Sequence, residues 1–259
     1  MIYIPSLVLP FVFGAVVGSF LNVCIYRIPA GVSIASPPSR CPACSKHIAF
    51  YDNIPIISYI VLMGRCRRCG STVSARYPVV EAITGLFASA LFFKFGLTPG
   101  FFIYSVFIAA LIVITFIDID HQIIPDVISL PGIPLGLIAS FFLPSVGIAD
   151  SLIGAISGGG LLFGIAAAYY YSTGKEGMGG GDVKLLAMIG AFTGWRGVLM
   201  TVLAGSVSGA ILGGALMLVH GKGGKHPIPF GPFLAAGAAV YVFAGEALIE
   251  WYIVRVAGF

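Results

Sequence analysis

Residues 100–120 read GFFIYSVFIAALIVITFIDID, and residues 100–117 contain no charged side chain. An α-helix needs about 20 apolar residues to cross the hydrocarbon core of a bilayer, so this stretch predicts a membrane span. Asp118 follows it directly, in a chain with only 10 acidic residues among 259. Hydrocarbon does not solvate a charged carboxylate. We therefore expect Asp118 to be paired, hydrated or used in chemistry.

The composition extends this interpretation to the whole chain. Hydrophobic residues make up 58% and charged residues 9%, whereas a soluble domain has about a quarter charged residues. Glycines at four-residue spacing, such as Gly14/Gly18 and Gly154/Gly158, favour close helix packing. We predict an all-α integral membrane protein with about eight transmembrane helices. The apolar segments lie near residues 2–25, 79–97, 100–117, 124–144, 150–171, 183–195, 197–219 and 231–254.

A different composition separates the first apolar segment from the second. Residues 26–78 hold 7 of the 14 Lys and Arg and four of the 5 Cys. We expect three parts: a first transmembrane helix in residues 1–25, a small cytoplasmic zinc-binding domain in residues 26–78, and a seven-helix membrane domain in residues 79–259. The first positive residue, Arg27, follows the first apolar segment. A signal peptide has its positive charge before the apolar region, so we predict an uncleaved helix.

The distribution of positive charge predicts the orientation in the membrane. Only Lys94, Arg196 and Arg255 fall on one predicted side, and the other 11 Lys and Arg fall on the opposite side. Positive residues favour the cytoplasmic side, which places the N-terminus outside. Asp118 and Asp182 are then both expected at the cytoplasmic face and at similar depth.

Two CxxC motifs, residues 41–44 and 66–69, are separated by 21 residues. Four thiolates at this spacing can surround one tetrahedral Zn²⁺. Disulfides are one alternative, but this segment is predicted to face the reducing cytoplasm. A thioredoxin-type redox site is another, but two paired motifs without a βαβ pattern argue against it. A closed four-sulfur site has no open position, so the zinc is expected to be structural. Cys24 lies in the first apolar segment and is interpreted as a packed thiol. The predicted ligands are Cys41, Cys44, Cys66 and Cys69.

Residues 177–182, GMGGGD, bring Asp182 to the head of a later apolar segment. Glycine permits close approach of another backbone, such as an extended peptide substrate. The alternative is a flexible hairpin whose Asp182 caps the following helix. With Asp118 at matching depth, the catalytic interpretation is favoured. Two neighbouring carboxyls share a proton, so one can activate water while the other polarises a peptide carbonyl.

The other polar residues near Asp118 are assigned structural roles. Asp120 points elsewhere if the helix continues. Asp126 follows Pro125 and is interpreted as a helix cap or a partner of the helix dipole. His121 is interpreted as a solvated loop residue.

These residues, in this order, resemble the type IV prepilin peptidases, the bifunctional leader peptidase/N-methyltransferases of type IV pilus and type II secretion systems. The resemblance covers essentially the whole chain and includes both CxxC motifs. It also rests on residues 18–23, 27–29, Asn53-Ile54-Pro55, Ser58-Tyr59, Arg76-Tyr77-Pro78, Glu81, 118–126, 174–186 and 227–232.

The resemblance implies an aspartic protease of the GxGD type in the bacterial inner membrane, with Asp118 and Asp182 as the catalytic pair. It implies cleavage of a basic leader after a glycine, just before the apolar helix of a prepilin or pseudopilin. The new N-terminal residue, usually phenylalanine, would then be methylated by S-adenosylmethionine. The family links its cysteine domain to methyl transfer.

Within that domain, Gly64 matches a glycine tied to methylation. Asp52 stands where relatives commonly carry Glu. The sequence has no glycine-rich fingerprint for the methyl donor. The expected partners are prepilins, pseudopilins and the lipid bilayer, and no nucleic acid is expected.

Two other functions would each explain part of the sequence. A membrane transporter could use its aspartates as a proton or cation relay. Against it, the acids lie at one interface, and no repeated pair of broken helices is visible. A non-enzymatic zinc-bearing scaffold would explain the CxxC motifs but not the aspartates.

Overall fold

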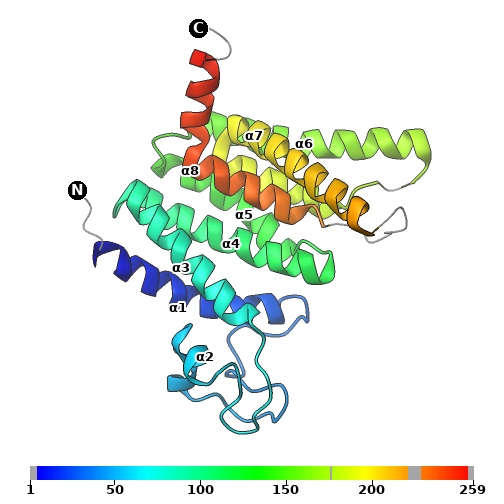
Figure 1. Cartoon of the computed structure of the whole chain (residues 1–259). Coiled ribbons are helices and arrows are strands. Elements are labelled where there is room, and N and C mark those ends of the chain that lie inside the picture. Colours follow the sequence, from blue (N-terminus) through cyan, green and yellow to red (C-terminus); the bar gives the residue numbers. More distant parts are fainter. Residues whose placement is uncertain (1–4, 176, 221–228, 256–259) are drawn as a thin grey trace. The chain divides into compact units, whose positions relative to one another are not determined.

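The computed structural model describes residues 5–175, 177–220 and 229–255. Within these residues the chain is almost entirely helical and contains no strand, only two isolated β-bridges (Figure 1). The elements are α1 (Pro5–Arg27), η1 (Phe50–Asn53), α2 (Ile57–Val61), α3 (Arg76–Phe95), α4 (Pro99–His121), α5 (Asp126–Ala139), η2 (Ser140–Phe142), α6 (Ile148–Thr173), α7 (Gly180–His220) and α8 (Gly231–Arg255).

Six of the described helices are long and apolar enough to cross a membrane: α1, α3, α4, α6, α7 and α8. The predicted all-α membrane architecture is therefore confirmed, but the count of eight spans is not. The count differs in two places. The segment Asp126–Phe142 is apolar but shorter than a full span. The segments expected at 183–195 and 197–219 form one element, α7, which is interrupted at Gly194 by non-helical backbone (φ 70°, ψ 179°).

The chain divides into two compact units, Met1–Val113 and Ile114–Phe259. In the first unit α1 packs along α3. A Cβ atom added to Gly14 would lie 2.6 Å from the Ala88 Cβ, and one added to Gly18 would lie 2.7 Å from the Glu81 Cα. Glycine at these two positions therefore lets the helix backbones approach closely, as their four-residue spacing predicts.

Polar contacts join α1 to α3 and tie the segment between them to α3. The Asn22 side chain of α1 donates to the Tyr77 carbonyl over 3.1 Å. Glu81 of α3 is 7% exposed and accepts the backbone N–H of Ile56 over 2.7 Å. Ile56 has a positive φ of 63°, which is rare for a β-branched residue. Glu81 therefore fixes an unfavourable turn directly before α2.

In the second unit α7 is central and packs against α5, α6 and α8. Residues 185–194 are buried without interruption, and Leu185, Leu186 and Ile189 are fully enclosed. Close packing again depends on glycine, because a Cβ on Gly158 of α6 would lie 3.0 Å from the Leu186 carbonyl carbon. This packing gives the first half of α7 a fixed place, and Asp182 lies at its start.

Candidate functional site

Asp118 lies in the last turn of α4 and is 5% exposed. Its Oδ2 accepts the backbone N–H of Gly231 over 3.0 Å. Gly231 is the first residue of α8, where backbone N–H groups have no partner within the helix. The α8 N-terminus therefore holds the carboxylate of Asp118 in one orientation.

The contact requires glycine at position 231. A Cβ atom there would lie 2.6 Å from Asp118 Oδ2 and 3.5 Å from Ile124 Cδ1. Gly231 belongs to the motif at 227–232, but nothing in the sequence alone indicated its role. Residues 227 and 228 of that motif lie outside the described residues.

Asp182 lies in the first turn of α7, in the same unit as Asp118. Its backbone N–H donates to the Gly179 carbonyl over 3.2 Å. The carboxyl is half-buried and lies within electrostatic range of Asp118. The structure thus brings together two acids that are 64 positions apart (118 to 182) in the sequence.

The glycines before Asp182 have different surroundings. A Cβ on Gly181 would lie 2.9 Å from the Ile124 Cβ, so this glycine allows α7 to approach the segment between α4 and α5. Gly179 and Gly180 face open space, because an added Cβ at either would meet no atom within 4 Å. Glu176, at the start of this segment, lies outside the described residues.

Asp120, His121 and Asp126, which were predicted to have structural roles, lie near Asp118 in the sequence. The helix continues through Asp120 and His121, and both are exposed, in contrast to Asp118. Asp126 is in the first turn of α5 but makes no side-chain cap. Instead, both of its carboxylate oxygens accept from Lys184 Nζ at 2.8 Å. Lys184 follows Asp182 by two residues, so this ion pair ties the start of α7 to the start of α5.

The second candidate site is the cysteine cluster, which belongs to the first unit. The Sγ atoms of its four cysteines lie within 4.8 Å of one another. None of them is in a disulfide. A tetrahedral Zn²⁺ with Zn–S bonds of ~2.3 Å places its sulfurs ~3.8 Å apart, and Cys41 Sγ lies 3.9 Å from Cys69 Sγ. The residues therefore fit the predicted metal. They are Cys41, Cys44, Cys66 and Cys69.

The two CxxC motifs form the same turn. The N–H of Ser45 donates to the Cys41 carbonyl over 2.8 Å, and the N–H of Gly70 donates to the Cys66 carbonyl over 2.9 Å. Ser45 and Gly70, each directly after a second cysteine, both have positive φ. Backbone N–H groups of Ala43 and Cys44 bond to the Cys41 sulfur, and that of Ser71 bonds to the Cys69 sulfur. These bonds favour the thiolate that a metal binds. Hydrogen bonds from the Cys44 backbone and the Ser71 hydroxyl lower the pKa of Cys41 to about 6. Against a backbone hydrogen bond from Lys46, burial and the neighbouring thiols of Cys41 and Cys69 raise the pKa of Cys44 to about 11.

The two methylation-linked candidates lie between the two CxxC motifs in the sequence. Asp52 forms a bidentate ion pair with Arg67, at 2.7 to 3.0 Å. Arg67 lies between the second pair of cysteines, so Asp52 ties η1 to that turn. Gly64 has a φ of 67°, and a Cβ there would lie 2.9 Å from the Tyr59 hydroxyl. Both residues therefore have an evident role in holding this segment together.

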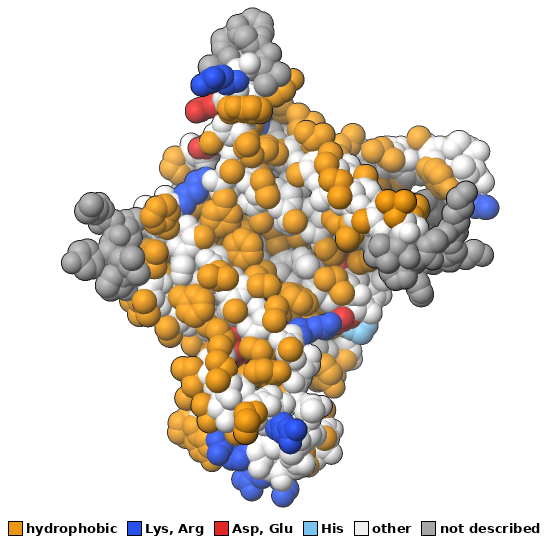
Figure 2. Space-filling view, viewed as in Figure 1, with side chains coloured by type: hydrophobic (Ala, Val, Ile, Leu, Met, Phe, Trp, Pro, Cys, Tyr) orange, Lys and Arg blue, Asp and Glu red, His pale blue; other side chains and the backbone are white. Residues whose placement is uncertain are grey.

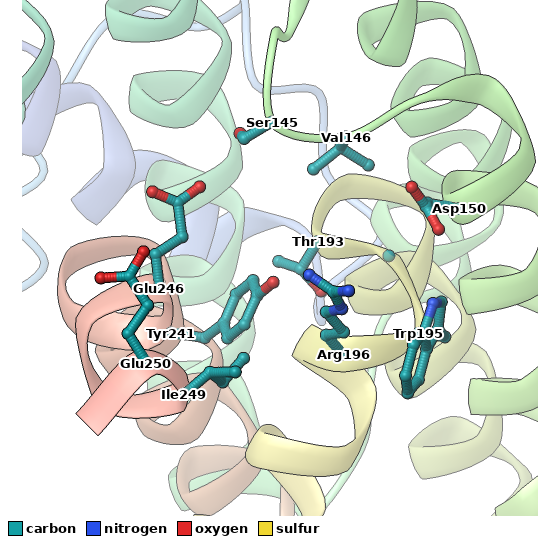
Figure 3. A pocket seen from close by; sticks show the side chains of 11 residues that line it. Ser145, Val146, Asp150, Thr193, Trp195, Arg196, Tyr241, Glu246, Ile249 and Glu250 are labelled. Carbon is teal, nitrogen blue, oxygen red and sulfur yellow. The ribbon is translucent and has the colours of Figure 1, made fainter. Parts of the chain in front are cut away.

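A cavity of about 260 Å³ lies in the second unit, near the break in α7 (Figure 3). Arg196 lies between Asp150 of α6 and the glutamates Glu246 and Glu250 of α8 in this view. Gly194 lines the cavity and follows Asp182 by 12 residues, which is ~18 Å along the unbroken part of the helix. The cavity is thus well separated from the aspartate pair.

Comparison with known proteins identifies two family regions. Residues 12–95 match the bacterial peptidase A24 N-terminal domain, and residues 105–214 match the type IV leader peptidase family. No solved structure matches the chain.

Curated relatives match over nearly the whole chain. The prepilin leader peptidase/N-methyltransferase of Aeromonas salmonicida (strain A449) is 36% identical over 95% of this chain and 93% of its own length. The protein of the same name from Pseudomonas aeruginosa is 36% identical over 95% and 92%, and that from Legionella pneumophila is 34% identical over 93% and 92%. Both family regions are present, and the relatives align over nearly their whole length. This chain therefore belongs to the prepilin leader peptidase/N-methyltransferase family.

Proposed function

We propose that this multi-pass inner-membrane protein removes the leader from prepilins and pseudopilins and N-methylates the new N-terminus. Asp118 and Asp182 are the catalytic pair of the cleavage reaction. The observation that carries this assignment is the meeting of two acids at the ends of two membrane-spanning helices, with Asp118 held by the Gly231 amide. The resemblance and the relatives' names support the reaction, and the geometry supports these two residues.

The pair acts as a proton relay for hydrolysis. Two nearby carboxyls share one proton, because both cannot ionise easily. The ionised carboxylate takes a proton from water as the water oxygen attacks the scissile carbonyl, whose oxygen accepts a hydrogen bond from the protonated carboxyl. When the tetrahedral intermediate collapses, the C–N bond breaks and the leaving amine takes a proton from the pair. The Gly231 amide keeps Asp118 oriented throughout.

The open space at Gly179 and Gly180 supports a place for the substrate beside the pair. An extended peptide can lie against a backbone that carries no side chains. The proposed cleavage follows a glycine, so the substrate is also small at this point. The distribution of positive residues supports a cytoplasmic position for the pair, at the face from which a basic leader is presented.

The cysteine cluster is proposed to hold a structural Zn²⁺ in the cytoplasmic domain formed by residues 26–78. Figure 2 shows lysine and arginine side chains gathered on this segment, which suits a domain outside the hydrocarbon. The metal supplies no chemistry in this role and stabilises a segment too small for a large core. Residues 79–259 form the proposed membrane domain with the protease site. The methyl donor is proposed to be S-adenosylmethionine.

The test is incubation of the purified protein with a prepilin and S-adenosylmethionine, followed by intact-mass measurement of the pilin. The wild type should remove the leader and add one methyl group. Asp118→Asn and Asp182→Asn should each abolish cleavage, because an amide cannot relay the proton. Asp120→Asn is the matched control on the same helix turn, where the side chain is exposed, and it should cleave normally.

A pilin supplied without its leader separates the two reactions. Both asparagine variants should methylate it at the wild-type rate, because the aspartates serve only cleavage. Normal cleavage of prepilin by either variant would remove that residue from the catalytic pair.

A further inference from the structure

An apolar patch lies outside the six candidate spans, on the short helix α2 and the residues beside it. Its members are 58% to 87% exposed, and we call them the α2 patch: Phe50, Ile57, Ile60, Val61 and Met63. Monomeric soluble domains do not usually gather exposed apolar side chains in this way. The patch therefore requires a partner.

The polarity of α2 is inverted relative to a helix on a soluble domain. Ile57, Ile60 and Val61 follow the i, i+3, i+4 spacing of one helix face, and that face points away from the protein. Ser58, on the other side, is buried. Its hydroxyl donates to the Tyr51 carbonyl over 3.0 Å and accepts the Ile54 N–H over 3.0 Å. The outer face of α2 is thus apolar, and its inner face carries a hydrogen-bonded serine. This arrangement suits a helix in an environment that is less polar than water.

Hydrogen bonds to the spans fix the depth of α2. Glu81 of α3 accepts the N–H of Ile56, and the Ser19 side chain of α1 also hydrogen-bonds this carboxylate. Glu81 lies five residues after Arg76, the first residue of α3, which is ~7.5 Å along the axis. The interfacial layer of a bilayer is ~5–7 Å thick on each side. If Arg76 lies at the outer edge of this layer, Glu81 and the turn bonded to it lie at its boundary with the hydrocarbon.

Positive charge beside the α2 patch suits the interface between membrane and water. Arg65 and Arg68 follow the patch and are both exposed. Basic side chains next to an inserted apolar face pair with lipid phosphates. Figure 2 shows hydrophobic side chains on this segment next to lysine and arginine side chains.

We propose that α2 and its flanking turns lie in the interfacial layer of the bilayer, with the α2 patch among the upper acyl chains. The segment with the metal-binding turns is joined covalently to the spans α1 and α3. In this proposal it also contacts the bilayer surface through α2, which does not cross the membrane. Glu81 is the residue that holds this contact at its depth.

The test measures the depth of an indole introduced into the patch. The chain has 2 Trp, Trp195 and Trp251, both exposed, and both are first replaced by Phe. Ile60→Trp is added to this background in one variant, and His47→Trp, at an exposed position on the first metal-binding turn, in the control. Each full-length protein is reconstituted into phosphatidylethanolamine/phosphatidylglycerol vesicles, with or without bromine on the acyl chains near the headgroup, and retained metal is measured to confirm folding.

The bromolipid should quench the Ile60→Trp variant several-fold more strongly than the His47→Trp control, and aqueous iodide should do the reverse. Adding Glu81→Gln to the Ile60→Trp variant should weaken the bromolipid quenching, because the amide is a poorer acceptor for the Ile56 N–H. Strong iodide quenching of the Ile60→Trp variant would overturn the proposal in favour of a water-exposed patch. Protection from both quenchers would overturn it in favour of a patch covered by protein. Neither result depends on which residues cleave the leader.

Discussion

The substitution Gly231→Ala tests the contact that orients Asp118. A Cβ atom at position 231 would lie 2.6 Å from Asp118 Oδ2, whereas ordinary van der Waals contact begins at 3.4 Å, so the carboxylate must move by about 0.8 Å. A misplacement of ~1 Å in a catalytic group costs ~100-fold in rate. This corresponds to ~2.7 kcal/mol of activation free energy. We expect kcat for leader cleavage to fall ~100-fold, with little change in KM.

The assay follows leader removal from a prepilin by intact mass at several substrate concentrations. Gly160→Ala is the matched control, because an added Cβ on this α6 residue meets no atom within 4 Å. It should cleave at the wild-type rate. Methylation of a pilin supplied without its leader should be normal in both variants, which shows that Gly231→Ala has not unfolded the protein. Cleavage at the wild-type rate by Gly231→Ala would refute the role of the Gly231 contact.

Three further predictions concern the glycine run and the metal cluster. Gly180→Ala should raise the KM for prepilin while leaving thermal stability unchanged, because its added Cβ meets only open space in the protein alone; an unchanged KM would place the peptide elsewhere. Asp52→Asn should weaken the exposed ion pair with Arg67, so a chelator should remove zinc a few-fold faster. An unchanged rate would show that the pair does not support the metal turn. Cys41→Ser with Cys44→Ser should release zinc and reduce methylation more than cleavage, and stoichiometric zinc in elemental analysis of this variant would contradict the assignment of the ligands.

Local features of the sequence predicted the parts of the site that depend on spacing. The two CxxC motifs form the same turn, which brings the two cysteines of each motif together. Pairing of the two turns then brings all four cysteines together. Asp118 and Asp120 are two residues apart on one helix, so one is buried and the other exposed, as helix geometry requires. The membrane spans follow from long apolar runs.

Contacts between distant segments could not be predicted in the same way. Gly231 reaches Asp118 across 113 positions, and this depends on where α8 begins once it has packed against α7. Asp126 has the sequence context of a helix cap, but its carboxylate pairs with Lys184, which only the packing of α5 on α7 brings near. The inverted polarity of α2 is also invisible in five residues of sequence, because it depends on how η1 packs against α2 and encloses Ser58.

The break at Gly194 divides α7 into unequal halves, and the half that carries Asp182 has residues 180–193, or ~21 Å of helix. The hydrocarbon of an unperturbed bilayer is ~30 Å thick. The distance from Asp182 to the charged residues around Arg196 is therefore shorter than the thickness of the hydrocarbon. Residues 185–193 of this half-helix are buried, so neighbouring helices rather than lipid cover it. The aspartates thus work across a layer of packed protein that is thinner than the surrounding hydrocarbon.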